Sequence, residues 1–409
     1  MAIDFGLSES SEQARDHYHQ VALDQMRPIS RRYDEEEHTP AKEWIDYWWQ
    51  EGRKVKPSGG RMDDGFVQVC IQAEELCWGD AGLYLRMPTP ALGGSAVGAV
   101  GTAEQKEKFM NTFASSPHPV WGAMAITEPS AGSDSAAIQA TADFDEAAQE
   151  WVLNGNKIFC TAGEGASTVE GGFVVVWATV DKSAGRAGIK SFVVPACTPG
   201  MTFVGTEDKL GIRASDTATL LFENCRVPAG NLLGSREVKK QGTKKGTGDK
   251  GFKGAMATFD ASRPVVAAMA VGVGRASLDF LKEELTRQGI EIRYDAPPSE
   301  LTALERDVME MEAELQAARL LTWRAAKLIS AGKPNNLEAS MAKAKAGLAV
   351  TKITQKAIEL LGPIGYSKRT LVEKWMRDAK INDIFEGTQQ INQLIVARRI
   401  LDYPSSMLR

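Results

Sequence analysis

Apolar and polar residues follow different patterns in successive parts of the chain. Residues 1–120 contain long runs of helix-forming residues, and one of them, "GFVQVCIQAEELCWGDAGLYL", is mostly apolar and interrupted near Gly79. In "GTAEQKEKFMNTFA", Thr102 precedes Gln105 by three residues, which is the capping-box pattern of a helix N-terminus. The pattern predicts a helical domain over residues 1–120.

Residues 121–235 are instead broken into short segments rich in β-branched and aromatic residues. Gly, Asn, Asp and Pro separate these segments, and "LNGNK" is typical of a hairpin turn. Because the segments follow one another closely with no helix between them, we expect an antiparallel β-barrel or sandwich. Residues 121–235 are therefore predicted to be a central β domain.

The last part of the chain is helical again, after a Gly/Lys-rich linker, "SREVKKQGTKKGTGDKGF". Four long helices are predicted here, and one of them keeps a buried three-and-four spacing at Val308, Met311, Leu315 and Ala318. Residues 250–409 are predicted to form a four-helix bundle. The predicted fold class is α+β, with this bundle following the N-terminal helical and central β domains.

Composition narrows the class of protein. The chain has 409 residues, of which 43% are hydrophobic and 25% charged, as in soluble globular proteins. Its net charge of −5 argues against a general nucleic-acid binder. No run of apolar residues is long enough for a membrane span, and the N-terminus lacks a secretory signal pattern. Five scattered cysteines suit a reducing, cytoplasmic location, and no Cys/His cluster indicates a metal site.

Glu386, within "DIFEGTQQIN", raises the first question about function. It stands between an apolar pair and a glycine, where a helix is predicted to begin. A solvated residue in an interhelical turn is the plain interpretation, because carboxylates usually lie in water. The alternative is a catalytic base. Apolar neighbours would raise its pKa toward the working pH, whereas the helix N-terminus would lower it.

Two further segments combine residues suited to binding a ligand. In "AMAITEPSAGSDSA", small residues allow a ligand to approach the backbone, and Thr127 and Ser133 add hydroxyl donors. In "KIFCTAG", Phe159 and Thr161 are two residues apart and share one face of a predicted strand, which suits a flat ring with polar edges. Taken singly, each pattern is also that of an ordinary loop or sheet pair.

Together these segments resemble the acyl-CoA dehydrogenase family, a group of FAD enzymes. "AMAITEPSAGSD" is similar to the first family signature, and "LGPIGYSKRTLVEKWMRDAKINDIFEGTQQINQLIVARRIL" to the second. "GFKGAMATFDASRPVVAAMAVGVGRASLD" resembles the start of the family's C-terminal bundle. The resemblance implies oxidation of an acyl-CoA thioester to a trans-2-enoyl-CoA in fatty acid β-oxidation. FAD would be the cofactor and electron-transfer flavoprotein the electron acceptor.

The resemblance also implies roles for individual residues. Glu386 would be the catalytic base that removes the Cα proton, while the Cβ hydride goes to the flavin. The implied cofactor-binding residues are Met124, Ile126, Thr127, Gly132, Ser133, Phe159, Cys160, Thr161, Arg287, Thr388 and Gln390. The implied substrate-binding residues are Ser133, Asp260, Arg263 and Gly387.

Two elements that family members lend to a neighbouring subunit's FAD are altered. The R-x-x-F-G element is replaced by "TRQGIEIRYDAPPSEL", in which Arg287 or Arg293 could substitute for the arginine, but phenylalanine and glycine are missing in register. The Q-x-x-G-G element reads "ELLGPIG", with Glu359 for glutamine and Pro363 for a glycine. Two interpretations remain: local variation within a homodimer or homotetramer, or a hetero-oligomer with a related chain.

The sequence leaves several alternatives for the reaction. The acyl chain is undetermined, and a dehydrogenase or reductase of cyclic or steroid-side-chain CoA thioesters is the main alternative. An acyl-CoA oxidase is also possible, because oxygen reactivity depends on solvent access to the flavin. From another class, the chain could be a non-catalytic flavin-binding subunit of a hetero-oligomeric acyl-CoA dehydrogenase, although the presence of Glu386 argues against this.

Overall fold

The N-terminal part is helical in the computed structural model, which describes residues 6–54, 65–238 and 250–403. Thr102 and Gln105 form the predicted capping box, and the predicted interruption near Gly79 is confirmed at Asp80, whose φ of −165° and ψ of 118° are not helical. The helices are α1 (Glu9–Val21), α2 (Arg27–Glu35), α3 (Lys42–Gln50), α4 (Gly65–Leu85), α5 (Ala91–Val100) and α6 (Ala103–Ser115).

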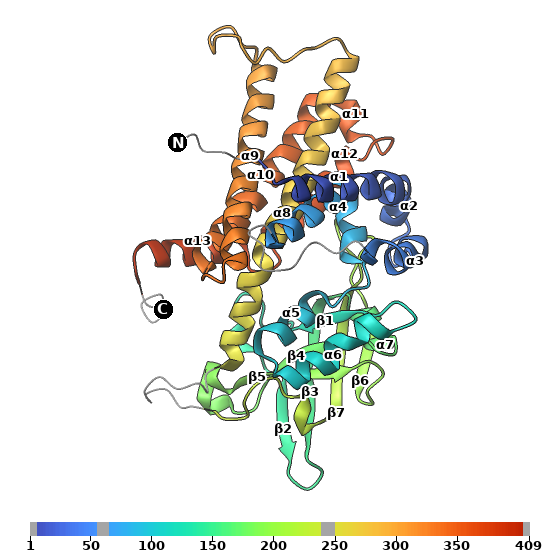
Figure 1. Cartoon of the computed structure of the whole chain (residues 1–409), viewed down its shortest axis with the longest axis vertical. Coiled ribbons are helices and arrows are strands. Elements are labelled where there is room, and N and C mark those ends of the chain that lie inside the picture. The colour runs from blue at the N-terminus through green and yellow to red at the C-terminus, as the bar shows by residue number, and fades with distance from the viewer. Residues whose placement is uncertain (1–5, 55–64, 239–249, 404–409) are drawn as a thin grey trace.

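A curled, mixed sheet forms the middle of the chain (Figure 1). Its strands are β1 (Gly122–Ala125), β2 (Thr141–Asp145), β3 (Glu150–Thr161), β4 (Phe173–Thr179), β5 (Ile189–Pro195), β6 (Met201–Thr206) and β7 (Thr217–Pro228). They lie in the order β1-β4-β2-β3-β7-β6, with β5 beside β4. Four pairings are antiparallel, as expected from the closely spaced strands, whereas β1 and β2 each pair parallel with β4. The short helix α7 (Gly163–Thr168) follows β3 directly.

The C-terminal part contains the predicted bundle of helices. Its members are α8 (Lys250–Arg287), α9 (Ala303–Ser330), α10 (Asn336–Leu361) and the shorter α13 (Gln389–Ile400), which packs on α10. The short helices α11 (Pro363–Tyr366) and α12 (Val372–Ala379) lie between α10 and α13 in sequence. The predicted stripe Val308, Met311, Leu315 and Ala318 is fully buried in the largest apolar core. Most of the predicted linker lies outside the described residues.

Helix α8 connects the sheet to the bundle, because it runs from beside the sheet to the far end of the bundle (Figure 1). Near its beginning, Met256 and Phe259 pack against the apolar cluster of the β domain that contains Met124 and Ile126. By length and composition, Met256–Arg287 could cross a membrane, but 78% of its most apolar window is buried inside the protein. Its apolar character is therefore that of a core helix.

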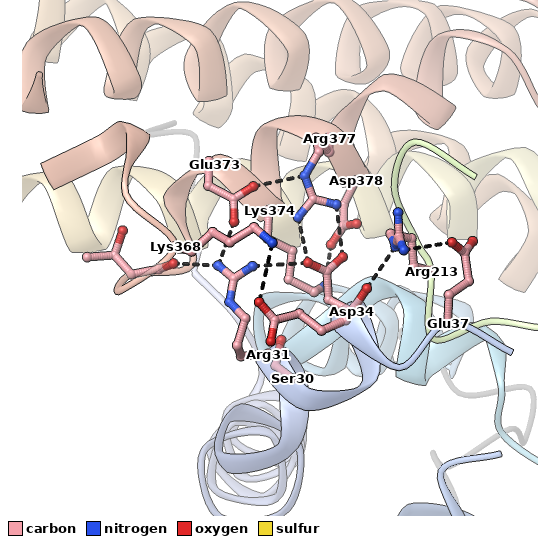
Figure 2. A network of polar contacts seen from close by, with 12 residues as sticks. Ser30, Arg31, Asp34, Glu37, Arg213, Lys368, Glu373, Lys374, Arg377 and Asp378 are labelled. Carbon is pink, nitrogen blue, oxygen red and sulfur yellow. Dashed lines mark hydrogen bonds and ion pairs between the residues drawn. The ribbon is translucent and has the colours of Figure 1, made fainter. Parts of the chain in front are cut away.

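A buried ion network joins the N-terminal helices to α12 (Figure 2). The Lys374 ammonium, 0% exposed, lies 2.8 Å from the Asp80 carboxylate and 2.5 Å from that of Asp378. Asp80 also accepts a hydrogen bond from Ser30, and Asp378 accepts one from the backbone N–H of Ile212 at 2.5 Å. The cluster thus ties α2, the kink in α4, the loop before β7 and α12 to one another.

Arg377 extends this network at its edge (Figure 2). Its guanidinium binds the Asp34 carboxylate in a fork, at 2.9 and 2.5 Å, and Glu373 at 2.8 Å. Arg31 joins the same two carboxylates from the N-terminal side. Because the chain passes from α12 through a 3₁₀ segment, Lys380–Asp383, directly toward Glu386, the network holds the segment that leads to this residue.

Candidate functional site

Glu386 lies in a left-handed turn just before α13. Its φ is +58°, and that of Gly387 is +89°, a conformation that glycine adopts freely and other residues only at some cost. Hydrogen bonds to both carbonyls hold the turn: Arg263 Nε donates to Glu386 O at 3.4 Å, and Lys343 Nζ and Asn392 Nδ2 donate to Gly387 O at 2.6 and 2.8 Å. The strained backbone is therefore supported from α8, α10 and α13.

The Glu386 carboxylate is half-buried and held on one side only. Ser262 Oγ donates to Oε2 at 2.5 Å, whereas Oε1 makes no hydrogen bond within the described part of the chain. Burial raises the pKa of Glu386 above its usual 4.5, while the Ser262 hydrogen bond and the charges of Arg263 and Lys343 oppose that rise. A carboxyl group with a raised pKa and one open oxygen is suited to accept a proton.

The segment after β1 forms a braced loop. Met124 and Ile126 are buried in the β domain, Thr127 is half-buried, and Gly132 and Ser133 are exposed. Their placement agrees with the expectation that the small residues of this loop leave backbone accessible.

An ion pair under this loop fixes its path. The Lys157 ammonium, buried within β3, donates to Ile126 O at 3.1 Å and to Glu128 Oε1 at 2.7 Å. The Glu128 carboxylate also accepts hydrogen bonds from the backbone N–H groups of Gln139 (2.6 Å) and Ala140 (3.0 Å). Burial lowers the pKa of Lys157 to about 8, and Glu128 opposes that change.

The end of β3 turns one aromatic ring outward. The pairing of β3 with β7 is irregular between Lys157 and Cys160, and Phe159 there has a φ of +57° and is 57% exposed. Such bulges commonly redirect a side chain. Thr161 is half-buried on the same, more open side, as predicted. The Cys160 side chain instead lies in the sheet core, with Sγ 3.5 Å from Met124 O, so only its backbone is available to a ligand.

These groups fit the flavin ring of FAD. Within the described residues, the side-chain hydroxyls of Thr127, Ser133 and Thr161 make no hydrogen bond, so their donors are free. Thr127 lies beside Phe159, because its carbonyl accepts a hydrogen bond from the N–H of Ile158 at 3.0 Å. An exposed aromatic ring with free hydroxyls around it suits a flat heteroaromatic group with polar edges.

Helix α8 brings this edge of the β domain close to Glu386. Phe259 packs against the cluster that contains Met124 and Ile126, and Ser262, three residues further on, donates to Glu386. Residues three apart lie on the same face of a helix, within one turn of about 5 Å. Ser262, the partner of the candidate base, is therefore one helical turn from a residue that packs against the cluster containing Met124 and Ile126.

Asp260 and Arg263 are both tied into the protein interior. Arg263 is only 3% exposed and binds Asp260 (2.9 Å) and Ser340 (3.4 Å) in addition to Glu386 O. Asp260 is half-buried, accepts a hydrogen bond from Asn336 at 2.7 Å, and has a pKa raised by burial. Arg263 thus supports the turn at Glu386 from below.

In the described chain, the other predicted cofactor-binding residues, Arg287, Thr388 and Gln390, make contacts only within or beside their own helices. Arg287 is exposed at the end of α8 far from the sheet (Figure 1), and pairs with Glu283 and Glu284. Thr388 caps α13, its hydroxyl accepting from Ile391 N at 3.3 Å, and Gln390 is exposed in the first turn. The described contacts of Arg287 therefore lie within the end of α8 and do not include Glu386.

Several residues of the site were not identified from the sequence. Ser262, Lys343, Asn392 and the Glu128–Lys157 pair all reach the site from other elements. Lys343 carries the clearest signal, because it interrupts an alanine-rich buried stripe on α10. A lysine at helical spacing within such a stripe must find an internal partner.

Two other features lie away from Glu386. A groove of about 240 Å³ between α9 and α10 is lined mainly by charged residues, among them Glu359, and contains none of the predicted catalytic, cofactor-binding or substrate-binding residues. Within the described ranges, Glu37, His38 and Asp208 form a group of three possible metal ligands. Because Arg213 already neutralises Glu37 at 2.9 Å, this group is a surface ion cluster.

Three protein-family models match successive parts of the chain. They are the acyl-CoA dehydrogenase N-terminal domain at residues 8–117, the middle domain at residues 123–225 and the C-terminal domain at residues 249–401. The order agrees with the succession of helices, sheet and helices in the structure.

Individual proteins are similar over nearly the full length. The chain is 36% identical over 402 residues to a bovine (Bos taurus) short-chain specific acyl-CoA dehydrogenase, mitochondrial, covering 97% of this chain and 91% of that protein. It is 32% identical over 405 residues to acryloyl-CoA reductase (NADH) from Anaerotignum propionicum, covering 98% and 96%. The structure of butyryl-CoA dehydrogenase from Megasphaera elsdenii matches with a TM-score of 0.82 at 31% identity, covering 98% and 100%.

Proposed function

Because this chain belongs to the acyl-CoA dehydrogenase family of FAD-dependent oxidoreductases, we propose that it converts an acyl-CoA thioester to a trans-2-enoyl-CoA and passes the electrons to electron-transfer flavoprotein. One observation carries the proposal. The Glu386 carboxylate has a raised pKa and one free oxygen, and its partner Ser262 lies one turn of α8 from Phe259, which packs against the β-domain cluster that contains Met124 and Ile126. Base and flavin would therefore meet the substrate from neighbouring positions.

Glu386 acts as the base in this proposal. Ser262 holds Oε2, so Oε1 is the oxygen that accepts the Cα proton of the substrate. Within the described residues, the backbone N–H groups of Glu386 and Gly387 donate to no acceptor. They can therefore bind the thioester oxygen, on which negative charge develops as the Cα proton leaves. Gly387 allows the thioester to approach this backbone, because it has no side chain.

The residues at the sheet edge hold the cofactor. Thr127 and Ser133 would donate to the polar edge of the flavin, and Phe159 and Thr161 would line its ring. Bound FAD would supply the acceptor for the Cβ hydride. Lys157 and Glu128 keep the Thr127 loop in place from beneath.

The proposal also covers the acyl chain of the substrate, the domains and the cellular location. Short straight-chain acyl-CoA thioesters are the first substrates to test, because the bovine relative is named short-chain specific and the Megasphaera structure is a butyryl-CoA dehydrogenase. Cyclic or steroid-side-chain thioesters are the alternative. Residues 1–120, 121–235 and 250–409 act as the three domains, in a cytoplasmic protein whose five cysteines are all free thiols.

Acyl-CoA should bleach the purified protein. Under anaerobic conditions, we expect butyryl-CoA to remove the visible flavin absorbance, because the Cα proton and Cβ hydride leave together. CoA without an acyl group is the control, and a panel of straight, branched and cyclic thioesters ranks the substrates by bleaching rate. Absence of bleaching by every thioester would contradict the proposed reaction.

A hetero-oligomer is a second candidate for the functional form. Arg287 and Arg293 are exposed and already paired with carboxylates of this chain, and Glu359 pairs with Lys356 at 2.8 Å. The groups that this chain would lend to a neighbouring FAD are thus altered or engaged. A related chain would then complete this chain's FAD site.

Flavin content distinguishes this form from a homodimer or homotetramer. For the hetero-oligomer, we expect the chain purified alone to hold much less than one FAD and to gain flavin and turnover when a related chain is added. The measurement is the ratio of flavin absorbance to protein, with mass from light scattering. Full flavin occupancy with turnover in the chain alone would establish the homo-oligomer instead.

A further inference from the structure

Lys343 is a buried cation with a neutral partner. Its side chain is 1% exposed in the middle of α10, and its ammonium donates to the carbonyl oxygen of Gly387 at 2.6 Å. Within the described residues it forms no ion pair. An ammonium group taken out of water without a counterion is strongly destabilising, so an anion nearby must compensate it.

Most other charges around this turn are already compensated. On α8, Arg263 pairs with Asp260 at 2.9 Å. In the 3₁₀ segment before the turn, Asp383 pairs with Lys380 at 3.0 Å and accepts a hydrogen bond from Thr351 at 2.9 Å. On α13, Arg399 binds the side chain of Asn336 at 2.9 Å and faces Asp260.

Besides the exposed Arg399, two charges around this turn have no ion pair in the described chain, the ammonium of Lys343 and the carboxylate of Glu386. Neither has an ion-pair partner within 4 Å in the described chain, and both belong to the same turn, because Lys343 binds the carbonyl of Gly387, the residue after Glu386. Among the carboxylates near Lys343, the charge of Glu386 acts on it most strongly, whereas Glu386 is acted on by the charges of both Arg263 and Lys343. We propose that Lys343 is a positioning residue for Glu386, whose ammonium holds the left-handed turn and whose charge keeps Glu386 in its basic form. This inference rests on the proposed role of Glu386.

Burial shifts the pKa values of both Lys343 and Glu386, and the charge of each group opposes the shift of the other. Burial lowers the pKa of Lys343 to about 8, and the charge of Glu386 opposes that change. Burial raises the pKa of Glu386, and the charges of Arg263 and Lys343 oppose it. Removal of the Lys343 charge should therefore raise the pKa of Glu386 further. The basic form of Glu386 would then be lost at a higher pH than in the wild type.

Two substitutions of Lys343 separate the effect of its charge from that of its hydrogen bond to Gly387 O, and a third substitution serves as the control. Lys343→Gln removes the charge but keeps an N–H donor for Gly387 O, and Lys343→Arg keeps both. Lys345→Gln is the matched control, because Lys345 lies on the same helix, two residues away, and pairs with Glu314 on α9. The residue two positions away points to a different helix face, so its loss should leave Glu386 unchanged.

The first measurement is a titration of the Glu386 carboxyl group. Infrared spectra of the flavin-loaded protein labelled with ¹³C-glutamate, without substrate, contain a carboxyl band that is missing in Glu386→Gln. We expect Lys343→Gln to raise the midpoint of this band by about one pH unit, as loss of a nearby opposite charge does. Lys343→Arg and Lys345→Gln should keep the wild-type midpoint. An unchanged midpoint in folded Lys343→Gln would overturn the inference.

The pH profile gives a second, independent comparison. In Lys343→Gln, the acid limb of kcat/KM should move up by about one pH unit, with about tenfold less activity on that limb and little loss at high pH. A merely structural role predicts an equal loss at every pH, which would also overturn the inference.

A reciprocal measurement decides the question if Lys343→Gln does not fold. Coupling between two sites acts equally in both directions, so Glu386→Gln should lower the pKa of Lys343 by a similar amount. NMR of ¹³C-labelled lysine reports that pKa, and an unmoved Lys343 resonance would overturn the inference. Retained turnover in Glu386→Gln would instead sink the proposed function, and would leave the charge coupling intact.

Discussion

Glutamine at position 386 should abolish turnover while the protein stays folded and yellow. The amide can keep the hydrogen bond with Ser262, but it cannot accept the Cα proton through the oxygen that faces the substrate. Loss of a general base typically lowers the rate by about 100- to 10,000-fold, and we expect a loss in the upper part of this range. Turnover is measured with butyryl-CoA and an artificial electron acceptor.

The control for this substitution is Glu359→Gln. Glu359 is an exposed carboxylate on α10 whose partner is Lys356, so its loss should leave turnover unchanged. In the wild type, activity should fall as the pH drops through the raised pKa of Glu386, because protonation removes the base. A Glu386→Gln protein with normal turnover but reduced thermal stability would show that Glu386 is only a structural residue.

The second large effect is expected on stability, from Lys374→Met. Lys374, Asp80 and Asp378 are all 0% exposed, and the lysine pairs with both carboxylates. Figure 2 shows Lys374 and Asp378 within this network. Removing the lysine leaves two buried negative charges together, and breaking a buried ion pair in this way costs about 3–5 kcal/mol. Because α12 leads toward Glu386, flavin retention should also fall. Calorimetric Tm and urea unfolding measure the loss.

Lys368→Met is the matched control, because Lys368 is 72% exposed in the same network and pairs with Glu35 at 3.4 Å. Exposed pairs contribute at most about 1 kcal/mol, so its Tm should stay near that of the wild type. The triple variant D80N/K374M/D378N should be more stable than Lys374→Met, because no unpaired charge remains. Equal Tm values for Lys374→Met and Lys368→Met would disprove the role assigned to this buried cluster.

Several local features of the fold could be predicted because they depend on residues close together in sequence, but the hairpin turn predicted at "LNGNK" was wrong, because β3 continues through it with an irregular pairing at Leu153 and Gly155. The capping box needs only Thr102 and Gln105, and the stripe Val308 to Ala318 follows from helical spacing. The break in the apolar helix near Gly79 was also visible, and it lies at Asp80. The local pattern around Glu386 favoured a solvated turn residue, and only the resemblance to the family motif predicted a catalytic base there.

Contacts between distant segments could not be predicted by these rules. Periodicity shows that Lys343 interrupts a buried stripe, but not that its ammonium reaches Gly387 across 44 residues of chain. Ser262 and Glu386 are 124 residues apart, and nothing in either local pattern pairs them. The parallel pairing of β1 with β4 and the outward turn of Phe159 likewise depend on which strands meet and in what register.

The amino-acid sequence by itself determined the helical and β segments, their order and the presence of one carboxylate suited to act as a base. These follow from short-range preferences and from motifs carried within single segments. Tertiary packing alone decided the surroundings of that carboxylate: its hydrogen bond to α8 and the cation on α10 that binds the carbonyl of the next residue. The pKa of Glu386 is set by these long-range neighbours, because burial and nearby charge exist only once the helices have packed.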